Sequence, residues 1–231
     1  PILINNWEAT YFDFNKNKLL SIADKAAEAG IELFVLDDGW FGNRNNDRSS
    51  LGDWYENKEK LGGSLAELAG DINDRGLMFG LWVEPEMVSP DSELYRKHPE
   101  WAIKVPGVAP HLSRHQLVLD YTRKDVRDHI VDRLASIFGN ANIEYVKWDM
   151  NRNITDAYSC ALPPERQGEF YHRYILGLYE VLERLTSAFP DILFEGCSGG
   201  GGRNDPGMLY YMPQNWSSDD TDAEERLYIQ Y

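Results

Sequence analysis

The chain has 231 residues, of which 38 are acidic and 23 basic, so its formal net charge is −15 at pH 7. Hydrophobic residues make up 42% of the sequence and aromatic residues 13%, which supplies a core and excludes a disordered chain. The acidic excess argues against nucleic-acid binding, because phosphate neutralisation requires clustered Lys and Arg. No apolar run approaches the roughly 20 residues of a membrane span. The two cysteines, Cys160 and Cys197, are too few for a disulfide framework.

Short apolar runs typical of buried strands alternate along the chain with longer segments of helical period. In chain order, the expected elements are strand Leu3–Trp7, helix Lys18–Ala29, strand Leu33–Asp37, helix Ser64–Asp74, strand Met78–Val83, strand Gln116–Tyr121, helix Asp125–Phe138, strand Glu144–Trp148, helix Pro164–Phe189, strand Ile192–Gly196, strand Tyr211–Trp216 and a last helix that starts at Ala223. This alternation predicts an α/β protein with a parallel sheet and crossover helices.

Two architectures fit the alternation, a doubly wound open sheet and a closed (β/α)8 barrel. Polar or aromatic residues follow nearly every expected strand. A closed barrel gathers all its carboxyl ends around one mouth, whereas an open sheet offers only its switch point. We therefore expect a (β/α)8 TIM barrel over residues 1–231, truncated after the seventh strand. Because the sequence starts at Pro1 and its last helix has no capping residue, we expect it to be a piece of a larger protein.

An acidic residue, Asp149, follows the expected strand Glu144–Trp148, inside the run Lys147–Arg152. The neighbouring Lys147 charge would keep Asp149 ionised at neutral pH, as a nucleophile must be. A structural ion pair at the strand end explains the same pattern, and the residues alone leave both interpretations open.

Three acids, Asp219, Asp220 and Asp222, lie within four residues after the expected strand Tyr211–Trp216. Like charges this close predict a raised pKa for at least one of them, which suits a general acid. The alternatives are a Ca²⁺ or Mg²⁺ loop, or an N-cap run in which Thr221 or Asp222 caps the last helix.

The doublet Asp37-Asp38, followed by Gly39-Trp40, ends the second expected strand. Because successive strand residues point to opposite faces, at least one carboxylate faces the mouth. Such a pair can bind sugar hydroxyls or, alternatively, a metal ion. The glycine run at 199–202 allows close backbone approach but lacks the Lys-Ser/Thr ending of a phosphate loop. Among the five histidines, only His111 and His115 are candidates for the mouth.

Four motifs together resemble the catalytic barrel of glycoside hydrolase family 36, the bacterial α-galactosidases. The motifs are DDGW at 37–40, KWDMNR at 147–152, CSGG at 197–200 and WSSDDTDA at 216–223. The likeness runs in order and spacing from Trp7 to the last residue. Two positions depart from the family pattern, since Asn204 replaces the usual Phe and Asn215 replaces the usual Thr or Cys.

The resemblance implies a retaining α-galactosidase that acts on terminal α-1,6-linked galactose in melibiose, raffinose and related oligosaccharides. It implies Asp149 as nucleophile and Asp219 as acid/base. The implied substrate-binding residues are Trp7, Asp37, Asp38, Trp82, Arg114, Lys147, Asn151, Cys197 and Gly199. The resemblance implies no cofactor and no metal.

The acidic surface is typical of a cytoplasmic enzyme, and we expect that location. The resemblance further implies a homo-oligomer, a tetramer, whose flanking β domains are absent from these residues. Because an unpaired barrel edge is costly, we expect the isolated segment to be weakly active or inactive. The alternatives are a raffinose-synthase-like transglycosidase, a galactose-binding module without catalysis, and a metal-dependent hydrolase.

Overall fold

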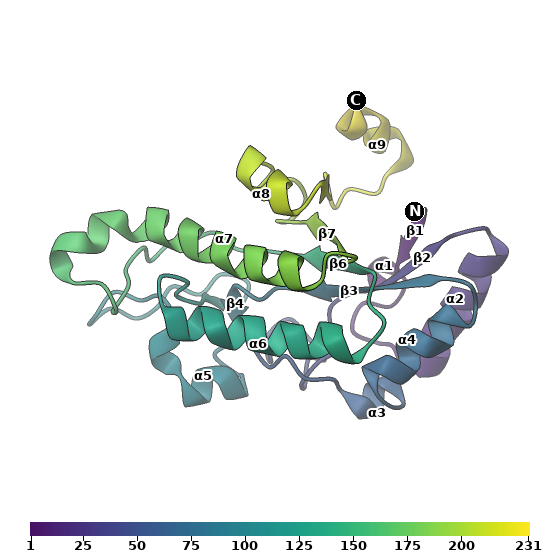
Figure 1. Ribbon diagram of the computed structural model, residues 1–231, viewed down its shortest axis with the longest axis horizontal. Coiled ribbons are helices and arrows are strands. Elements are labelled where there is room, and N and C mark those ends of the chain that lie inside the picture. Colours follow the sequence, from purple (N-terminus) through teal and green to yellow (C-terminus); the bar gives the residue numbers. More distant parts are fainter.

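The computed structural model describes all 231 residues and has one curled parallel sheet flanked by helices (Figure 1). In spatial order its strands are β1 (Leu3–Asn5), β2 (Leu33–Leu36), β3 (Met78–Val83), β6 (Tyr145–Trp148), β7 (Leu193–Gly196) and β8 (Gln214–Asn215). Every neighbouring pair is parallel. Beyond β8, the hydroxyl group of Thr221 donates to Glu8, which follows β1, at 3.0 Å. This contact links the two ends of the curved sheet, and the expected α/β barrel class is confirmed.

The helices are α1 (Trp7–Thr10), α2 (Lys16–Glu28), α3 (Lys58–Leu61), α4 (Leu65–Asn73), α5 (Glu93–Lys97), α6 (Lys124–Asn140), α7 (Phe170–Ala188), α8 (Pro206–Tyr211) and α9 (Ala223–Gln230), with 3-10 turns η1 (Pro99–Trp101) and η2 (Pro164–Glu169). The first eight lie between strands, whereas α9 follows the last strand and stands apart from the sheet (Figure 1). Local chemistry sets several of these boundaries. At the start of α4, for example, Ser64 and Glu67 form a reciprocal capping box.

The expected strand Gln116–Tyr121 is not part of the main sheet, and the count of seven strands is wrong. Only β5 (Leu117–Val118) forms there, and it pairs antiparallel with β4 (Met87–Val88) in a separate two-stranded sheet. Strand β3 pairs directly with β6, so the parallel sheet has six strands. An apolar run indicates burial but does not reveal which sheet completes its hydrogen bonds.

The expected strand Tyr211–Trp216 is reduced to the two residues of β8. Most of the preceding segment is helix α8, because Asp205 accepts hydrogen bonds from the N–H groups of Gly207 and Met208 and Pro206 occupies the first turn. The last helix begins at Ala223 as expected, and Asp222 is its cap.

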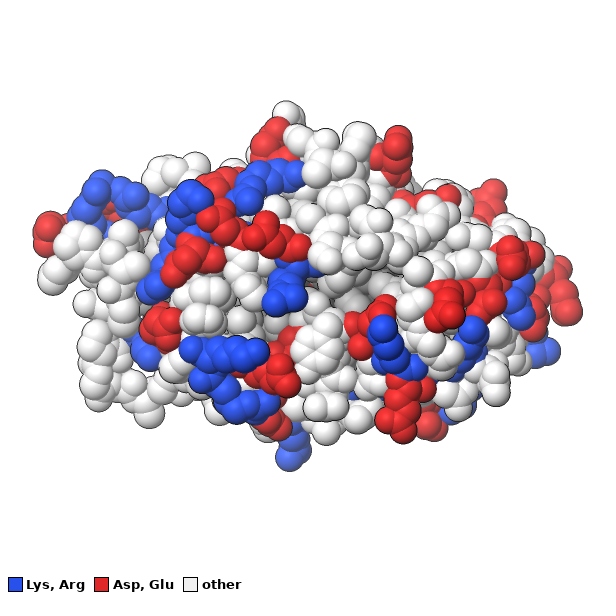
Figure 2. All heavy atoms as spheres, turned by 60° about the horizontal axis from the view of Figure 1, so that its bottom comes forward, with Lys and Arg blue, Asp and Glu red and all other residues white.

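Most of the core is one apolar cluster of 47 buried residues, and a second, small cluster contains Leu33, Val35 and Tyr145. Helices α6 and α7 lie side by side across the large cluster (Figure 1). Ion pairs also connect these two helices, at 2.8 Å between Arg184 and Asp128 and at 3.0 Å between Arg127 and Glu180. On the face drawn in Figure 2, acidic and basic side chains are interspersed. None of the helices has both the length and the apolar character needed to cross a membrane.

Candidate active site

A cavity of about 400 Å³ opens where the parallel strands end. Its walls come from strands β1, β2, β3, β6 and β7, from the segments after β1, β2, β6 and β8, and from the loop that holds Arg114. Nine of the eleven residues predicted for the site line this cavity, and they are Trp7, Asp37, Asp38, Trp82, Arg114, Lys147, Asp149, Asn151 and Asp219. The curvature of the sheet thus brings together residues that are more than 200 positions apart in the sequence.

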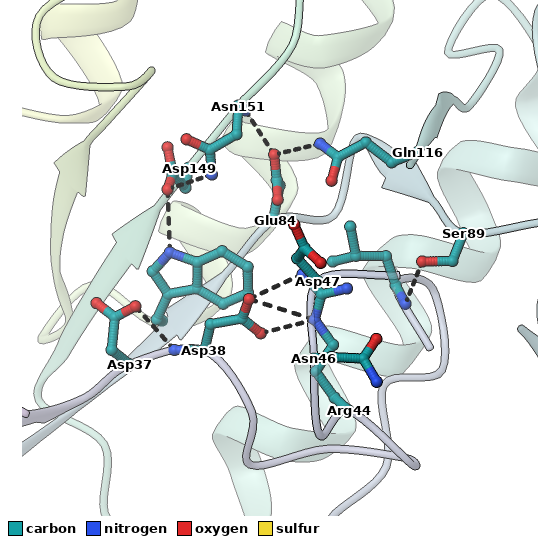
Figure 3. A network of polar contacts seen from close by, with 12 residues as sticks. Asp37, Asp38, Arg44, Asn46, Asp47, Glu84, Ser89, Gln116, Asp149 and Asn151 are labelled. Atoms are coloured by element: carbon teal, nitrogen blue, oxygen red, sulfur yellow. Dashed lines mark hydrogen bonds and ion pairs between the residues drawn. The ribbon is translucent and has the colours of Figure 1, made fainter. Parts of the chain in front are cut away.

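Asp149, immediately after β6, is buried at the cavity wall and held by three N–H donors, of which the side chain of Asn151 is labelled in Figure 3. Its Oδ2 accepts from the indole Nε1 of Trp82 at 3.1 Å and from Nδ2 of Asn151 at 2.6 Å. Its Oδ1 accepts from the backbone N–H of Met150 at 2.8 Å. All three donors are neutral, so the carboxylate is oriented without an ion pair.

The doublet after β2 is anchored by two cations. Asp37 Oδ2 accepts from Nδ2 of Asn5 at 2.5 Å and from Nζ of Lys147 at 3.2 Å. Asp38 binds the guanidinium of Arg44, with Nε–Oδ1 at 3.0 Å and Nη2–Oδ2 at 2.8 Å. Burial raises the pKa of Asp38, and the Arg44 charge opposes that rise. Both carboxylates therefore have a fixed orientation before any ligand arrives.

Lys147 forms its ion pair with Asp37 and not with Asp149, contrary to the pairing suggested by their closeness in sequence. Along a strand, residues 147 and 149 point to the same face. The closer carboxylate is nevertheless Asp37, which follows β2 on the far side of β3. Burial lowers the pKa of Lys147, but the surrounding carboxylates, Asp37 foremost, raise it above its ordinary value. The ammonium also lies 5.6 Å from the centre of the Trp216 ring. Lys147 thus stays charged in the cavity.

Asp219 is exposed and lines the cavity, and its Oδ1 accepts from the indole Nε1 of Trp216 at 2.8 Å. Two residues of the glycine run support this segment. The N–H of Gly201 donates to the Ser217 carbonyl at 3.0 Å. Gly200 has a φ of +93°, and a side chain there would lie 2.9 Å from the Cα of Ser218. The close backbone approach predicted for the glycines is therefore made to the Asp219 segment.

Cys197 and Gly199 do not line the cavity. The Cys197 thiol is buried, and burial together with the adjacent Asp149 charge raises its pKa. Gly199 is exposed, with a φ of +53°. Arg114, which lies between His111 and His115 in the sequence, lines the cavity, whereas neither histidine does.

Three buried acids in or next to the site were assigned no role from the sequence: Glu195 on β7 lines the cavity, whereas Glu84 and Glu86 lie outside its lining. Glu84 and Glu86 flank Pro85 directly after β3, and both are almost completely buried. Glu86 forms an ion pair with Arg203 at 2.7 Å. The sequence feature that could have indicated Glu84 and Glu86 is a pair of acids around a proline, directly after an apolar run. Arg44, by contrast, lies in a polar loop, and nothing in the sequence indicated that it is buried.

A curled parallel sheet with carboxylates gathered at its carboxyl ends is the active-site arrangement of a (β/α)-barrel enzyme. The family model described as Melibiase matches residues 1–231, and the chain belongs to this family. Similar proteins include the α-galactosidase AgaA of Geobacillus stearothermophilus, 64% identical over 231 residues, and α-galactosidase 1 of Pediococcus pentosaceus, 59% identical. The alignment covers 100% of this chain and 32% of each relative, so the chain spans about a third of their length.

The crystal structure of AgaA, a family 36 α-galactosidase, matches the whole of this chain with a TM-score of 0.98, and the match covers 32% of the AgaA chain. A variant of AgaA in complex with raffinose matches with the same score, identity and coverage. These likenesses confirm the resemblance to glycoside hydrolase family 36.

Proposed function

We propose that the whole protein is a retaining α-galactosidase that releases terminal α-1,6-linked galactose from oligosaccharides of the melibiose and raffinose type. The observation that carries this proposal is the pair of unlike carboxylates in one cavity. Asp149 is buried and oriented by neutral donors, whereas Asp219 is exposed and can exchange its proton with water. The AgaA complexes with raffinose and stachyose support the substrate class.

In this mechanism Asp149 attacks the anomeric carbon while Asp219 protonates the departing glycosidic oxygen. Water then attacks the galactosyl-enzyme, Asp219 accepts its proton, and galactose leaves with its anomeric configuration retained.

The remaining residues of the site bind the sugar in this proposal. Asp37 and Asp38 accept hydrogen bonds from the galactose 4- and 6-hydroxyl groups, and Lys147 and Asn151 bind ring hydroxyls. Each carboxylate has about four acceptor positions, so the two anchored aspartates keep lone pairs for a ligand. The further proposed contacts are Trp7, Trp82, Arg114, Cys197 and Gly199.

A regularity in the AgaA variants supports the two catalytic assignments. One aspartate is replaced by asparagine in the raffinose complex, and another by alanine in the stachyose complex. The two replaced positions are separated by as many residues as Asp149 and Asp219 are in this chain. Replacing a catalytic carboxylate is a usual way to trap a substrate intact.

The test is hydrolysis of a nitrophenyl α-galactoside by the whole protein and by its Asp149→Ala and Asp219→Ala variants. We expect Asp149→Ala to lose turnover and azide to restore part of it, giving the β-galactosyl azide. With Asp219→Ala, azide should give the α-galactosyl azide, because the nucleophile is intact. Wild-type turnover in Asp149→Ala would refute the assignment. Galactose binding without nitrophenol release would indicate a binding module instead.

Two further points stay predictions. A transglycosidase would transfer galactose to excess acceptor sugar, and product analysis distinguishes it from a hydrolase. The homo-oligomer and the flanking β domains implied by the family resemblance stay predictions, as does the cytoplasmic location expected from the acidic surface. Light scattering on the whole protein measures the oligomeric state.

A further inference from the structure

A carboxyl group to which the proposed mechanism gives no role lies next to the Asp149 segment. Glu84 follows β3 and is 1% exposed. Its Oε1 accepts from the backbone N–H of Asn151 at 2.5 Å and from Nε2 of Gln116 at 2.9 Å (Figure 3). Glu84 therefore ties the end of β6 to the end of β3 and to the loop before β5.

The contact with Asn151 reaches Asp149 in one further step. The backbone of Asn151 is held by Glu84, and its side chain donates to Asp149 Oδ2 at 2.6 Å. A second donor to Asp149 is the N–H of Met150, the residue between them. Two of the three groups that orient Asp149 thus belong to a short segment whose position Glu84 fixes.

The surroundings of Glu84 favour its neutral form. The charged groups that face it are the carboxylates Asp149, after β6, and Asp38, after β2, and no cation pairs with it. Burial, together with these two charges, raises the pKa of Glu84 to about 8, although the Asn151 and Gln116 hydrogen bonds oppose the rise. At neutral pH the protonated form of Glu84 therefore predominates, so Glu84 adds no charge beside Asp149.

We propose that Glu84 is a positioning residue whose carboxyl group, through the N–H of Asn151, holds the 149–151 segment so that Asp149 faces the anomeric carbon. This inference rests on the proposed function. Ionisation of Glu84 would place a second negative charge beside Asp149 in a buried site, where like charges repel strongly. The segment would then move, and misplacement by about 1 Å costs a reaction on the order of 100-fold in rate.

The test compares Glu84→Gln and Glu84→Ala in the whole protein, with kcat measured against pH on a nitrophenyl α-galactoside. Glutamine keeps an oxygen that accepts from Asn151 and cannot ionise. We expect Glu84→Gln to keep the parent kcat near pH 6.5 and to lose less activity above pH 8. We expect Glu84→Ala to lower kcat by about 10- to 100-fold at every pH, with a smaller change in KM.

The matched control is Asp120→Asn, which alters another buried carboxylate. Asp120 is 1% exposed and bonds Thr122 and Ser159, outside the cavity. It should leave the pH profile of kcat as in the parent. Asp219 is unchanged in both Glu84 variants. A shift in the alkaline limb of the kcat–pH profile therefore reports the ionisation of Glu84.

Two results would overturn the inference: an alkaline limb in Glu84→Gln identical to that of the parent, or a kcat in Glu84→Ala equal to that of the parent. Glu84→Gln decides the matter even when Glu84→Ala does not fold. Asp149→Ala, measured alongside, separates the two proposals. Full activity in Asp149→Ala refutes the proposed function, whereas an inactive Asp149→Ala with unaffected Glu84 variants refutes only the positioning role.

Discussion

Replacing Arg44 by methionine removes the cation bound to Asp38 and leaves a similar volume in its place. The two side chains are 3% and 9% exposed, and three N–H···O contacts of 2.8 to 3.2 Å join them. Arg44 also donates to the Ser49 carbonyl at 2.8 Å. Removing one partner of such a buried pair leaves an unpaired charge and costs about 3–5 kcal/mol. We expect Arg44→Met to lower the free energy of unfolding by this amount near pH 8.

The cost depends on pH in a direction that follows from the pKa of Asp38. Burial already raises that pKa in the parent, and Arg44 opposes the rise. Without Arg44 the pKa rises further, and at acidic pH Asp38 becomes neutral. The unpaired charge then disappears, so the penalty of Arg44→Met is smaller at pH 5.5 than at pH 8. Adding Asp38→Asn to Arg44→Met should recover part of the stability at pH 8 for the same reason.

Urea unfolding followed by tryptophan fluorescence measures these differences, with Arg75→Met as the control. Arg75 pairs with Asp24 at 2.6 Å, but the two side chains are 27% and 55% exposed. An ion pair this open to solvent contributes only about 0–1 kcal/mol. The reasoning is refuted if Arg44→Met costs no more than Arg75→Met, or if its cost is the same at both pH values.

Three further substitutions test other contacts. Trp82→Phe removes the indole N–H that donates to Asp149 at 3.1 Å and keeps an aromatic ring. We expect kcat to fall by about 10-fold or more while the melting temperature barely changes. An unchanged kcat would contradict this role of Trp82. Gly177→Ala on α7 directs a methyl group into the backbone carbonyl of Tyr121, which cannot rotate away. The midpoint of thermal unfolding should therefore fall by several degrees. An unaltered midpoint would argue against this close packing. Burial lowers the pKa of His129 to about 4, so the unfolded chain binds a proton between roughly pH 6.5 and pH 4 that the folded chain does not, and stability is lost as pH falls through this window. His129→Gln should therefore lose less stability than the parent between pH 7 and pH 5, and equal losses measured by urea unfolding would exclude this account.

The expected elements that the structure confirms are those with local signals. Helix α4 begins at the predicted Ser64 cap, and Asp222 caps α9, because both depend on contacts within four residues. The run Gln116–Tyr121 was misassigned because its backbone partner is β4, a segment of two strand residues with no pattern of its own. Periodicity identifies a buried strand, whereas pairing depends on residues far apart in the chain.

The same distinction separates the site residues that could be predicted from those that could not. Asp37 and Asp149 follow apolar strands, and the carboxyl ends of parallel strands converge on one mouth. The buried position of Arg44 follows from tertiary packing around Asp38, and arginine in a polar loop is ordinarily exposed. The contact between Glu84 and Asn151 joins residues 67 positions apart. Only the fold brings them together.

The distribution of cations in the site is consistent with the role of nucleophile that we propose for Asp149. Three buried carboxylates have a cation, in the pairs Asp37–Lys147, Asp38–Arg44 and Glu86–Arg203. Asp149 has neutral N–H donors instead. An ion pair would stabilise the carboxylate in the ground state and would weaken as its charge is lost on bonding to carbon, which raises the barrier. Neutral donors orient the same oxygens at a smaller ground-state cost. The cations of two of these pairs thus fix Asp37 and Asp38, the proposed sugar-binding acids, whose charge would persist through the proposed reaction. Asp149, the proposed nucleophile, whose charge would not persist, forms no ion pair.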